Sequence, residues 1–288
     1  MRLNKYIAQN SSYSRREADR LIFEGSIKIE NKVITNPATD VEDGVKLFLK
    51  GKLLRKKTDS TVIVYNKPKG ELVTKSDPEG RKTIYHSLGG KYRGFRPVGR
   101  LDYSSEGVLI LSDSVEIVDT LMHSNLERVY NVKVNGFITQ KVITAMESGL
   151  KIRNSIEGAN EQTDIMDLNL MPFNWYEIVK NHPNFSIVKV SLSEGKNREI
   201  RRFFGNLGLD VLDLKRVSFG WINLNNLPTG KRRFFSRKEY EELRAYMKGL
   251  KNGTLDNGKE SLQFSDKEGF IDDDSVEEDI KNMKIERG

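Results

Sequence analysis

The sequence contains no cysteine, only three histidines and only two tryptophans. The absence of cysteine excludes a disulfide framework and a cysteine-ligated metal, and three histidines are a poor basis for a zinc centre. No stretch approaches the apolar length that spans a bilayer, and the N-terminal segment is amphipathic without a long apolar core. We therefore predict no metal site, no membrane partner and a cytoplasmic location.

Acidic residues are outnumbered over most of the chain. Residues 1–250 hold 42 basic and 30 acidic side chains, whereas residues 251–288 hold 6 basic and 11 acidic ones, which leaves a net charge of +7. The basic excess favours a polyanionic partner, most simply nucleic acid, because neutralised phosphates release counterions. Solvated basic surfaces are also common on proteins with other functions. The composition of residues 251–288 predicts an acidic, disordered tail.

Residues 1–52 are predicted to form a compact unit of two helices and a few short strands. Apolar residues recur at helical spacing in each helix, and Ser14 to Glu17 form a capping box that begins the second helix, which Gly25 ends. Arg15 and Arg16 lie at the helix start, where the partial positive charge of the helix end disfavours cations. A bound phosphate would complete this arrangement, and Arg20 follows one turn later. The alternative is a capped surface helix with solvated arginines.

Residues 53–60 are basic and lack periodicity, so we interpret them as a linker. Residues 61–250 alternate between strand and helix patterns and are predicted to form a second domain of mixed α and β structure. Its first strand, at residues 62–65, leads into a turn forced by Pro68 and Gly70. Lys67 in this turn is, on its residues alone, a solvated turn lysine.

A second bend, from Gly99 to Asp102, precedes a short apolar run at residues 108–111 that is predicted to be a strand buried on both faces. This bend contains one carboxylate, that of Asp102, which directly follows Arg100 and Leu101. Spacing alone favours an ordinary explanation, because an Asp in a glycine-containing loop usually bonds to its own backbone.

Two further elements carry candidate site residues. Tyr130 alternates with valines on one face of a predicted strand, which is the usual pattern of a core tyrosine. A helix after Asn197 has an apolar stripe that includes Ile200. At 100° per residue Arg201 lies beside this stripe, whereas Arg198 and Arg202 are predicted to point largely away from it. Arg201 is therefore the arginine expected to be partly buried.

Two family resemblances join these features. Residues 1–52, through Leu3 to Ile7 and Ser14 to Ala18, resemble the small RNA-binding domain named after ribosomal protein S4. Residues 61–245 resemble RNA pseudouridine synthases of the RsuA/RluB family, through the turn at 66–70, the loop at 99–109, the Tyr130 strand and the 194–202 helix. The segment Asp77 to Arg81 resembles most the RluB branch, which modifies large-subunit ribosomal RNA.

The resemblance implies an α+β protein: an S4-like domain and a mixed, largely antiparallel synthase domain at 61–250. It implies isomerisation of uridine to pseudouridine in ribosomal RNA, without cofactor, in a pocket that holds a flipped base. The catalytic residues implied are Asp102, Arg201 as its counter-ion and Tyr130 against the base. The residues expected to bind substrate are Arg100, Leu101, Ile200, Lys67 and Arg198, and those expected to bind RNA are Arg15, Arg16 and Arg20.

The expected partner is ribosomal RNA or a ribosome-assembly intermediate, bound by a monomer. Two alternatives remain: the same chemistry on small-subunit RNA, and a non-catalytic RNA-binding assembly factor. The first is disfavoured by the match at residues 77–81. The second predicts RNA binding without conversion.

Overall fold

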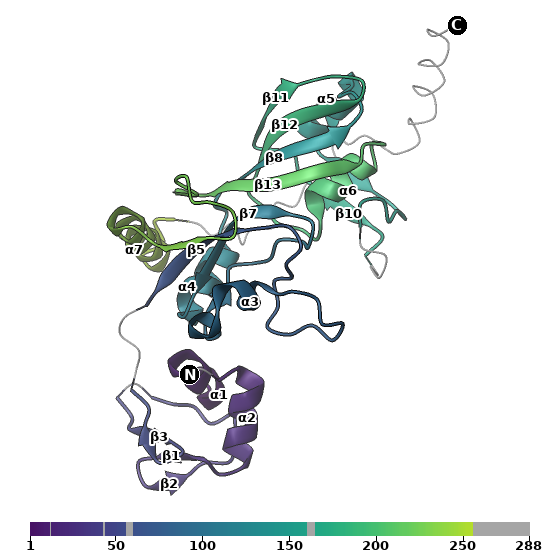
Figure 1. The fold of residues 1–288 in the computed structure, drawn as a ribbon. Helices are drawn as coiled ribbons and strands as arrows, with labels where there is room; N and C mark the ends of the chain where they lie inside the picture. The colour runs from purple at the N-terminus through teal and green to yellow at the C-terminus, as the bar shows by residue number, and fades with distance from the viewer. Residues whose placement is uncertain (12, 43, 56–59, 160–164, 256–288) are drawn as a thin grey trace, which may run out of the picture.

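The computed structural model describes residues 1–11, 13–42, 44–55, 60–159 and 165–255, which form a small N-terminal unit and a larger unit built on a long sheet (Figure 1). Within these residues no helix has the length and apolarity needed to cross a membrane. Most of the predicted acidic tail lies outside the described residues, and helix α7 extends to Lys251.

The N-terminal unit packs two helices on a four-stranded sheet of order β2-β1-β3-β4. Its elements are α1 (Leu3–Asn10), α2 (Arg15–Phe23), β1 (Ile27–Ile29), β2 (Lys32–Val33), β3 (Leu47–Leu49) and β4 (Lys52–Leu53). The predicted capping box is confirmed, because the Glu17 amide donates to Ser14 Oγ and the Ser14 amide donates to the Glu17 carboxylate. Leu54 packs on the small core and donates to Leu47 O, so this unit extends past the predicted boundary at residue 52.

The large sheet has the strand order β11-β12-β8-β13-β7-β5-β15, with β14 paired to β13 and β6 paired to β7. Its strands are β5 (Val62–Lys67), β6 (Arg96–Pro97), β7 (Glu106–Ser112), β8 (Arg128–Asn135), β11 (Trp175–Lys180), β12 (Phe185–Leu192), β13 (Val211–Phe219), β14 (Ile222–Asn223) and β15 (Arg232–Phe234). Every pairing is antiparallel except that of β13 with β7. The largely antiparallel α+β architecture predicted from the sequence is thus confirmed.

Both faces of the sheet centre are buried. In β7, Leu109 and Leu111 belong to one apolar cluster, whereas Val108 and Ile110 belong to another on the opposite face. Because successive side chains of a strand point to opposite faces, a continuous apolar run is what such a strand requires. The prediction of a strand buried on both faces is confirmed.

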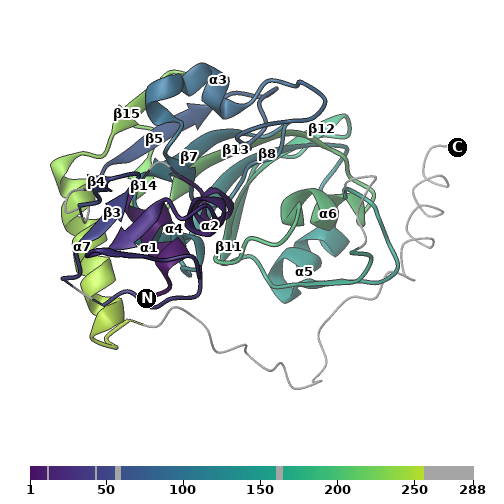
Figure 2. The same ribbon diagram turned by 90° about the horizontal axis from the view of Figure 1, so that it is seen from below.

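Helices cover each face of the sheet (Figure 2). Residues of α3 (Ile84–Leu88), α5 (Gln140–Ser148) and α6 (Glu199–Gly205) pack in the first cluster, and residues of α4 (Val115–Met122) and α7 (Arg237–Lys251) pack in the second. A short 3-10 helix spans Gly90–Tyr92, and β9 (Leu150–Ile152) pairs with β10 (Leu168–Leu170) as a separate two-stranded sheet beside α6. The two units of the chain touch where the Arg96 guanidinium donates to Ala8 O at 2.9 Å.

Helix α6 differs from its predicted orientation at one residue. Arg202 was expected to point away from the apolar stripe, but its side chain is completely buried. Residues between β9 and β10 contact that side of the helix: Arg202 donates to Ser155 O at 3.0 Å and to Met166 O at 3.1 Å. Helical-wheel spacing gives the wrong environment for Arg202 because this helix of seven residues is enclosed on more than one side.

Candidate active site

The side chain of Lys67 forms hydrogen bonds with the loop that carries Asp102. The Lys67 ammonium group donates to Asp102 O at 3.0 Å, to Ser105 O at 2.8 Å and to Pro68 O at 3.0 Å. Lys67 stands at the end of β5, whose last residues pair with the start of β7, so the sheet brings the two turns together. The loop backbone is therefore held by charge-assisted hydrogen bonds at Asp102 and at Ser105.

Lys67 is predicted to bind substrate, and in the structure its side chain is enclosed by the protein itself. Its side chain is 0% exposed, it does not line the pocket, and its three donors are all used by main-chain oxygens. Burial lowers the pKa of Lys67 to about 8, against the opposing attraction of Glu71, Asp102 and Glu106. Lys67 thus shapes the loop that presents Asp102.

Two arginines approach the same oxygen of Asp102. Arg201 Nε lies 3.5 Å from Asp102 Oδ2, and Arg198 Nη1 lies 3.7 Å from it. The remaining nitrogens of Arg201 donate to Val211 O, Ser104 O and Ser105 Oγ at 3.1–3.3 Å, so it contacts the carboxylate through one nitrogen only. Burial lowers the pKa of Arg201, whereas the charge of Asp102 opposes that effect. The guanidinium is held in place chiefly by backbone contacts.

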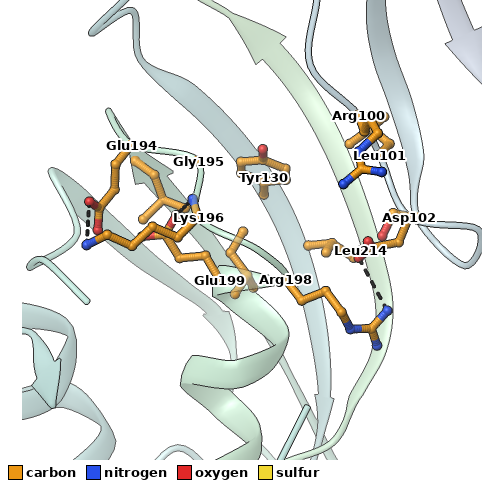
Figure 3. A pocket seen from close by; sticks show the side chains of 13 residues that line it. Arg100, Leu101, Asp102, Tyr130, Glu194, Gly195, Lys196, Arg198, Glu199 and Leu214 are labelled. Carbon is orange, nitrogen blue, oxygen red and sulfur yellow. Dashed lines mark hydrogen bonds and ion pairs between the residues drawn. The ribbon is translucent and has the colours of Figure 1, made fainter. Parts of the chain in front are cut away.

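Arg198 reaches Asp102 because it precedes the helix instead of belonging to it. It is the N-cap of α6, with a left-handed backbone at φ 49°, and its Nε donates to Gly158 O at 2.9 Å. Helical-wheel spacing therefore does not describe its direction. The expectation that Arg198 points largely away from the helix stripe does not conflict with a position beside Asp102 (Figure 3).

A pocket of about 80 Å³ lies between the Asp102 loop and the start of α6 (Figure 3). It is lined by Arg100, Leu101, Asp102, Ser105, Tyr130, Leu192, Glu194, Gly195, Lys196, Arg198, Glu199, Ile200 and Leu214. The structure therefore brings Asp102, Tyr130, Arg100, Leu101, Ile200 and Arg198 together from three separate sequence regions. Arg201 supports the pocket from behind Asp102, with a side chain only 10% exposed.

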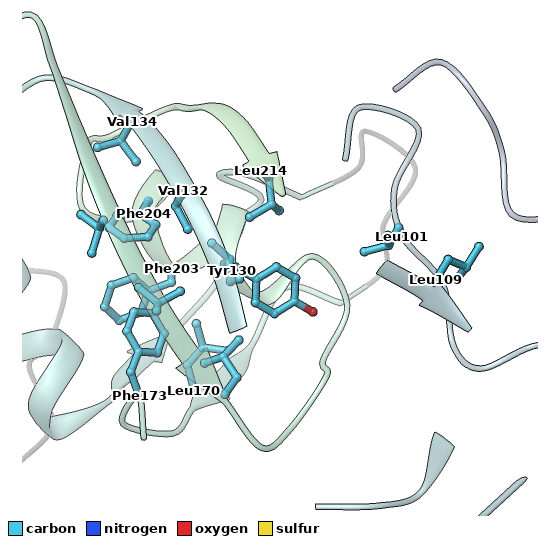
Figure 4. Packing of buried hydrophobic residues seen from close by; sticks show 14 of the residues in the cluster. Leu101, Leu109, Tyr130, Val132, Val134, Leu170, Phe173, Phe203, Phe204 and Leu214 are labelled. Atoms are coloured by element: carbon cyan, nitrogen blue, oxygen red, sulfur yellow. The ribbon is translucent and has the colours of Figure 1, made fainter. Parts of the chain in front are cut away.

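Tyr130 belongs to both the core and the pocket. Its residue is 9% exposed, it packs in the first apolar cluster, and its hydroxyl points away from Phe173 and Phe203 (Figure 4). The core interpretation and the pocket interpretation of Tyr130 are thus both correct in part. One aromatic ring, four aliphatic side chains and several charged groups line a site suited to a planar base with polar edges.

Two acidic side chains that the sequence does not predict as site residues, Glu194 and Glu199, also line the pocket. Both belong to the 194–202 motif, so the signal for them was already in the sequence. Burial first, and then the Glu194 carboxylate, raise the pKa of Glu199 to about 8. By contrast Leu214, on β13, is an ordinary alternating strand residue that no motif distinguishes.

The arginines predicted to bind RNA lie on the N-terminal unit, away from the pocket. Arg15, Arg16 and Arg20 are exposed on α2. Arg20 Nε lies 3.7 Å from Glu24 of the same helix. Exposure leaves these cations available to a polyanion, and their role remains a prediction.

Comparisons with known proteins agree with this architecture. Residues 1–47 match the family model described as an S4 domain, and residues 61–206 match that of RNA pseudouridylate synthases. The chain is thus an enzyme that acts on RNA. A protein of Helicobacter pylori strain J99, named an uncharacterized RNA pseudouridine synthase, is 49% identical over 254 residues, which are 88% of this chain and 97% of that protein. This chain belongs to the RNA pseudouridine synthase family, whose members are isomerases.

Relatives with a named ribosomal target are more distant. Ribosomal large subunit pseudouridine synthase B of Bacillus subtilis strain 168 is 30% identical, with 87% of this chain and 98% of that protein covered. The enzyme of the same name from Haemophilus influenzae is 33% identical, with 80% of this chain and 63% of that protein covered. A crystal structure of a pseudouridylate synthase shares the fold, with a TM-score of 0.56 at 23% identity, covering 84% of this chain and 99% of that one.

Proposed function

We propose that this enzyme converts a specific uridine of large-subunit ribosomal RNA to pseudouridine, with Asp102 as the catalytic aspartate. The observation that carries the assignment of Asp102 is its position: it is the carboxylate of the pocket that two arginines face, at 3.5 and 3.7 Å. The two named relatives that act on the large ribosomal subunit support the choice of RNA.

The reaction breaks the bond between N1 of uracil and C1′ of the ribose and forms a bond from C5 to the same carbon, while a proton leaves C5 and one is gained at N1. The base must leave the RNA stack to enter a pocket in the protein. Tyr130, Ile200 and Asp102 line this pocket together, which supports a role for Asp102 in contact with the nucleotide. Arg201 orients the carboxylate, and Arg198 and Arg100 are placed to meet phosphate oxygens at the pocket mouth.

The N-terminal unit supplies binding that is independent of the reaction. Its exposed arginines on α2 provide positive charge for phosphates, which accounts for affinity but not for choice of base. Site selection then depends on the RNA fold that reaches both units. We expect the enzyme to act as a monomer in the cytoplasm on ribosomal RNA or on an assembly intermediate.

The test is conversion of uridine in ribosomal RNA taken from cells that lack the gene. The wild-type protein should convert one position of large-subunit RNA, and Asp102→Asn should bind the same RNA within about threefold and yield no product. The substitution keeps the size of the side chain and removes its negative charge. Full activity of Asp102→Asn would remove Asp102 from its role.

The same experiment separates the alternatives. Conversion confined to small-subunit RNA would replace the proposed substrate and leave the chemistry unchanged. Binding by the wild-type protein without conversion of either RNA would favour a non-catalytic assembly factor. Size-exclusion chromatography with light scattering checks the monomeric state.

A further inference from the structure

Glu194 and Glu199 form an acid pair on the pocket wall (Figure 3). Glu194 follows β12 and is fully engaged: one carboxylate oxygen accepts from the Met171 amide at 3.1 Å and the other lies 2.7 Å from Lys196 Nζ. Glu199 is the first residue of α6 and is only 5% exposed. Its Oε2 accepts from the Lys196 amide at 2.9 Å.

The second oxygen of Glu199 lacks a donor. Within the described part of the chain, Glu199 Oε1 is buried and no donor reaches it. A buried carboxylate oxygen without a donor is costly, and the Glu194 carboxylate, which lines the same pocket, further disfavours the charged form of Glu199. A proton on one of the two groups resolves both problems, because a neutral carboxyl group donates to its charged neighbour.

The hydrogen bonds show which group carries the proton. Glu194 already receives a backbone amide and a lysine ammonium, both of which favour its charged form. Although burial alone would raise the pKa of Glu194, the donors from Glu199, Lys196 and the Met171 amide together lower it. Glu199 receives only one amide and is more deeply buried, so the proton belongs to Glu199.

We propose that neutral Glu199 is a positioning residue of the active site, whose carboxyl proton bridges to Glu194 and fixes the segment between β12 and α6. This segment carries Arg198, which faces Asp102, and it leads directly into Ile200 and Arg201. The inference rests on the proposed function of this pocket. It adds two residues to the site and assigns them opposite protonation states.

The charges around Glu199 are few. Lys196 attracts both members of the acid pair and lies on the same segment, while Arg128 of β8 is the further cation that acts on Glu199. Neither compensates for a second negative charge, because Lys196 Nζ is bound to Glu194 and to Asn169 O, and Arg128 donates to Ser193 O and Ser124 O. Loss of the proton therefore leaves two charged carboxylates next to each other on the pocket wall. Their repulsion releases the segment between β12 and α6.

The proton can be observed directly by NMR of protein labelled with ¹³C at the glutamate carboxyl carbons. We expect one resonance of the full-length wild type to titrate near pH 8 and to be absent from Glu199→Gln. In Glu194→Gln the neighbouring negative charge is gone, so this titration should move down by about one pH unit or more. If no glutamate carboxyl of the wild type titrates above pH 6.5, the bridge is overturned.

The positioning role is tested by the rate of pseudouridine formation at pH 7 and pH 9 in single turnover. Between pH 7 and pH 9 the rate of the wild type should fall by a factor about ten times larger than the rate of Glu199→Gln. The reason is that a group with a midpoint near 8 is about nine-tenths neutral at pH 7 and one-tenth neutral at pH 9. Glutamine keeps an N–H donor to Glu194 and has no proton to lose. Glu177→Gln, on the exposed strand β11, is the matched control and should follow the wild type.

Titration of Lys67 and of the RNA itself is common to both proteins and cancels from this ratio. Parallel loss of rate in wild type and Glu199→Gln would overturn the positioning role. If the wild type converts no uridine in any ribosomal RNA, the proposed function fails instead, and the NMR titrations still decide whether the acid pair shares a proton.

Discussion

Basic side chains of the two units differ in how firmly they are held. At the pocket, Arg201 and Lys67 are buried, and their donors are used by named oxygen atoms. On α2, Arg15 and Arg16 are exposed at a helix start. A buried cation acts by where it places its neighbours, whereas an exposed cation acts through charge that salt can screen. We therefore expect basic residues to fix geometry in the larger unit and to contribute RNA affinity in the N-terminal unit.

The strongest test of this difference is Arg201→Lys. Charge is retained, but the single ammonium nitrogen cannot occupy the three positions from which Nε, Nη1 and Nη2 of Arg201 contact Asp102, Val211 O and Ser105. We expect the single-turnover rate to fall by about 100-fold, with RNA affinity changed by less than threefold. Arg237→Lys on exposed α7 is the control and should keep the wild-type rate. If RNA affinity fell as much as the rate, Arg201 would act through its charge, as is expected of the exposed arginines of α2.

Lys67→Met should have the next largest effect. It preserves side-chain length but leaves three main-chain oxygens without their donor. Each lost partner of a buried group costs about 1–3 kcal/mol, partly regained because a buried charge is removed. We expect a lower urea midpoint and a rate reduced by about tenfold. An unchanged urea midpoint would show that the Asp102 loop does not need Lys67 for its stability.

The stability difference between wild type and Lys67→Met should also depend on pH. Since the folded state lowers the pKa of Lys67 from 10.5 to about 8, the unfolded chain binds more protons between these values. The contribution of Lys67 to the unfolding free energy therefore rises with pH from about 8 to 10.5 and is constant below. Urea unfolding of both proteins at pH 7.5 and pH 10 measures it, and a difference that shrinks with pH would contradict the lowered pKa.

Among the exposed cations, the double variant Arg15→Gln and Arg16→Gln should weaken RNA binding by about tenfold at moderate salt. It should reduce the slope of log affinity against log salt by about 1.5, because each phosphate contact on single-stranded RNA contributes about 0.7. The rate at saturating RNA should remain that of the wild type. Filter binding at four salt concentrations provides the slope, and an unchanged slope would mean that α2 does not meet phosphates.

The smallest effect is expected for Arg20→Gln. This residue loses an exposed pair with Glu24 at 3.7 Å, which contributes less than about 0.5 kcal/mol to stability. Affinity should fall by about twofold if one phosphate contact is lost. A fall as large as that of the double variant would show that α2 binds RNA along its length and not at its start.

Much of this fold follows from patterns within single segments. The capping box at Ser14, the apolar run of β7 and the alternation around Tyr130 each depend on neighbours in sequence, and each is found in the structure. Spacing does not predict the surroundings of Lys67 and Arg202, because most of their partners come from distant segments. Two of the three oxygens that bind Lys67 lie 35 and 38 residues away, and those that bind Arg202 lie 47 and 36 residues away. Spacing along one segment carries no information on such partners.

The candidate site was predicted better than its surroundings because motif resemblance supplied long-range information. It associated Asp102 with Arg201, and the structure brings them to 3.5 Å. The motif resemblance did not indicate the proton between Glu194 and Glu199, because neither periodicity nor a motif shows how deeply one carboxyl group is buried. Side-chain chemistry that depends on depth needs the packed chain.

Strand β13 determines when a newly synthesised chain can become active. It is made after residue 210, yet it lies between β8 and β7 and supplies the parallel join between the two halves of the sheet. Asp102 precedes β7 in one half, and Arg201 follows β12 in the other. A growing chain that ends before Val211 therefore lacks the strand that brings these residues together, and the enzyme acquires its pocket only late in translation.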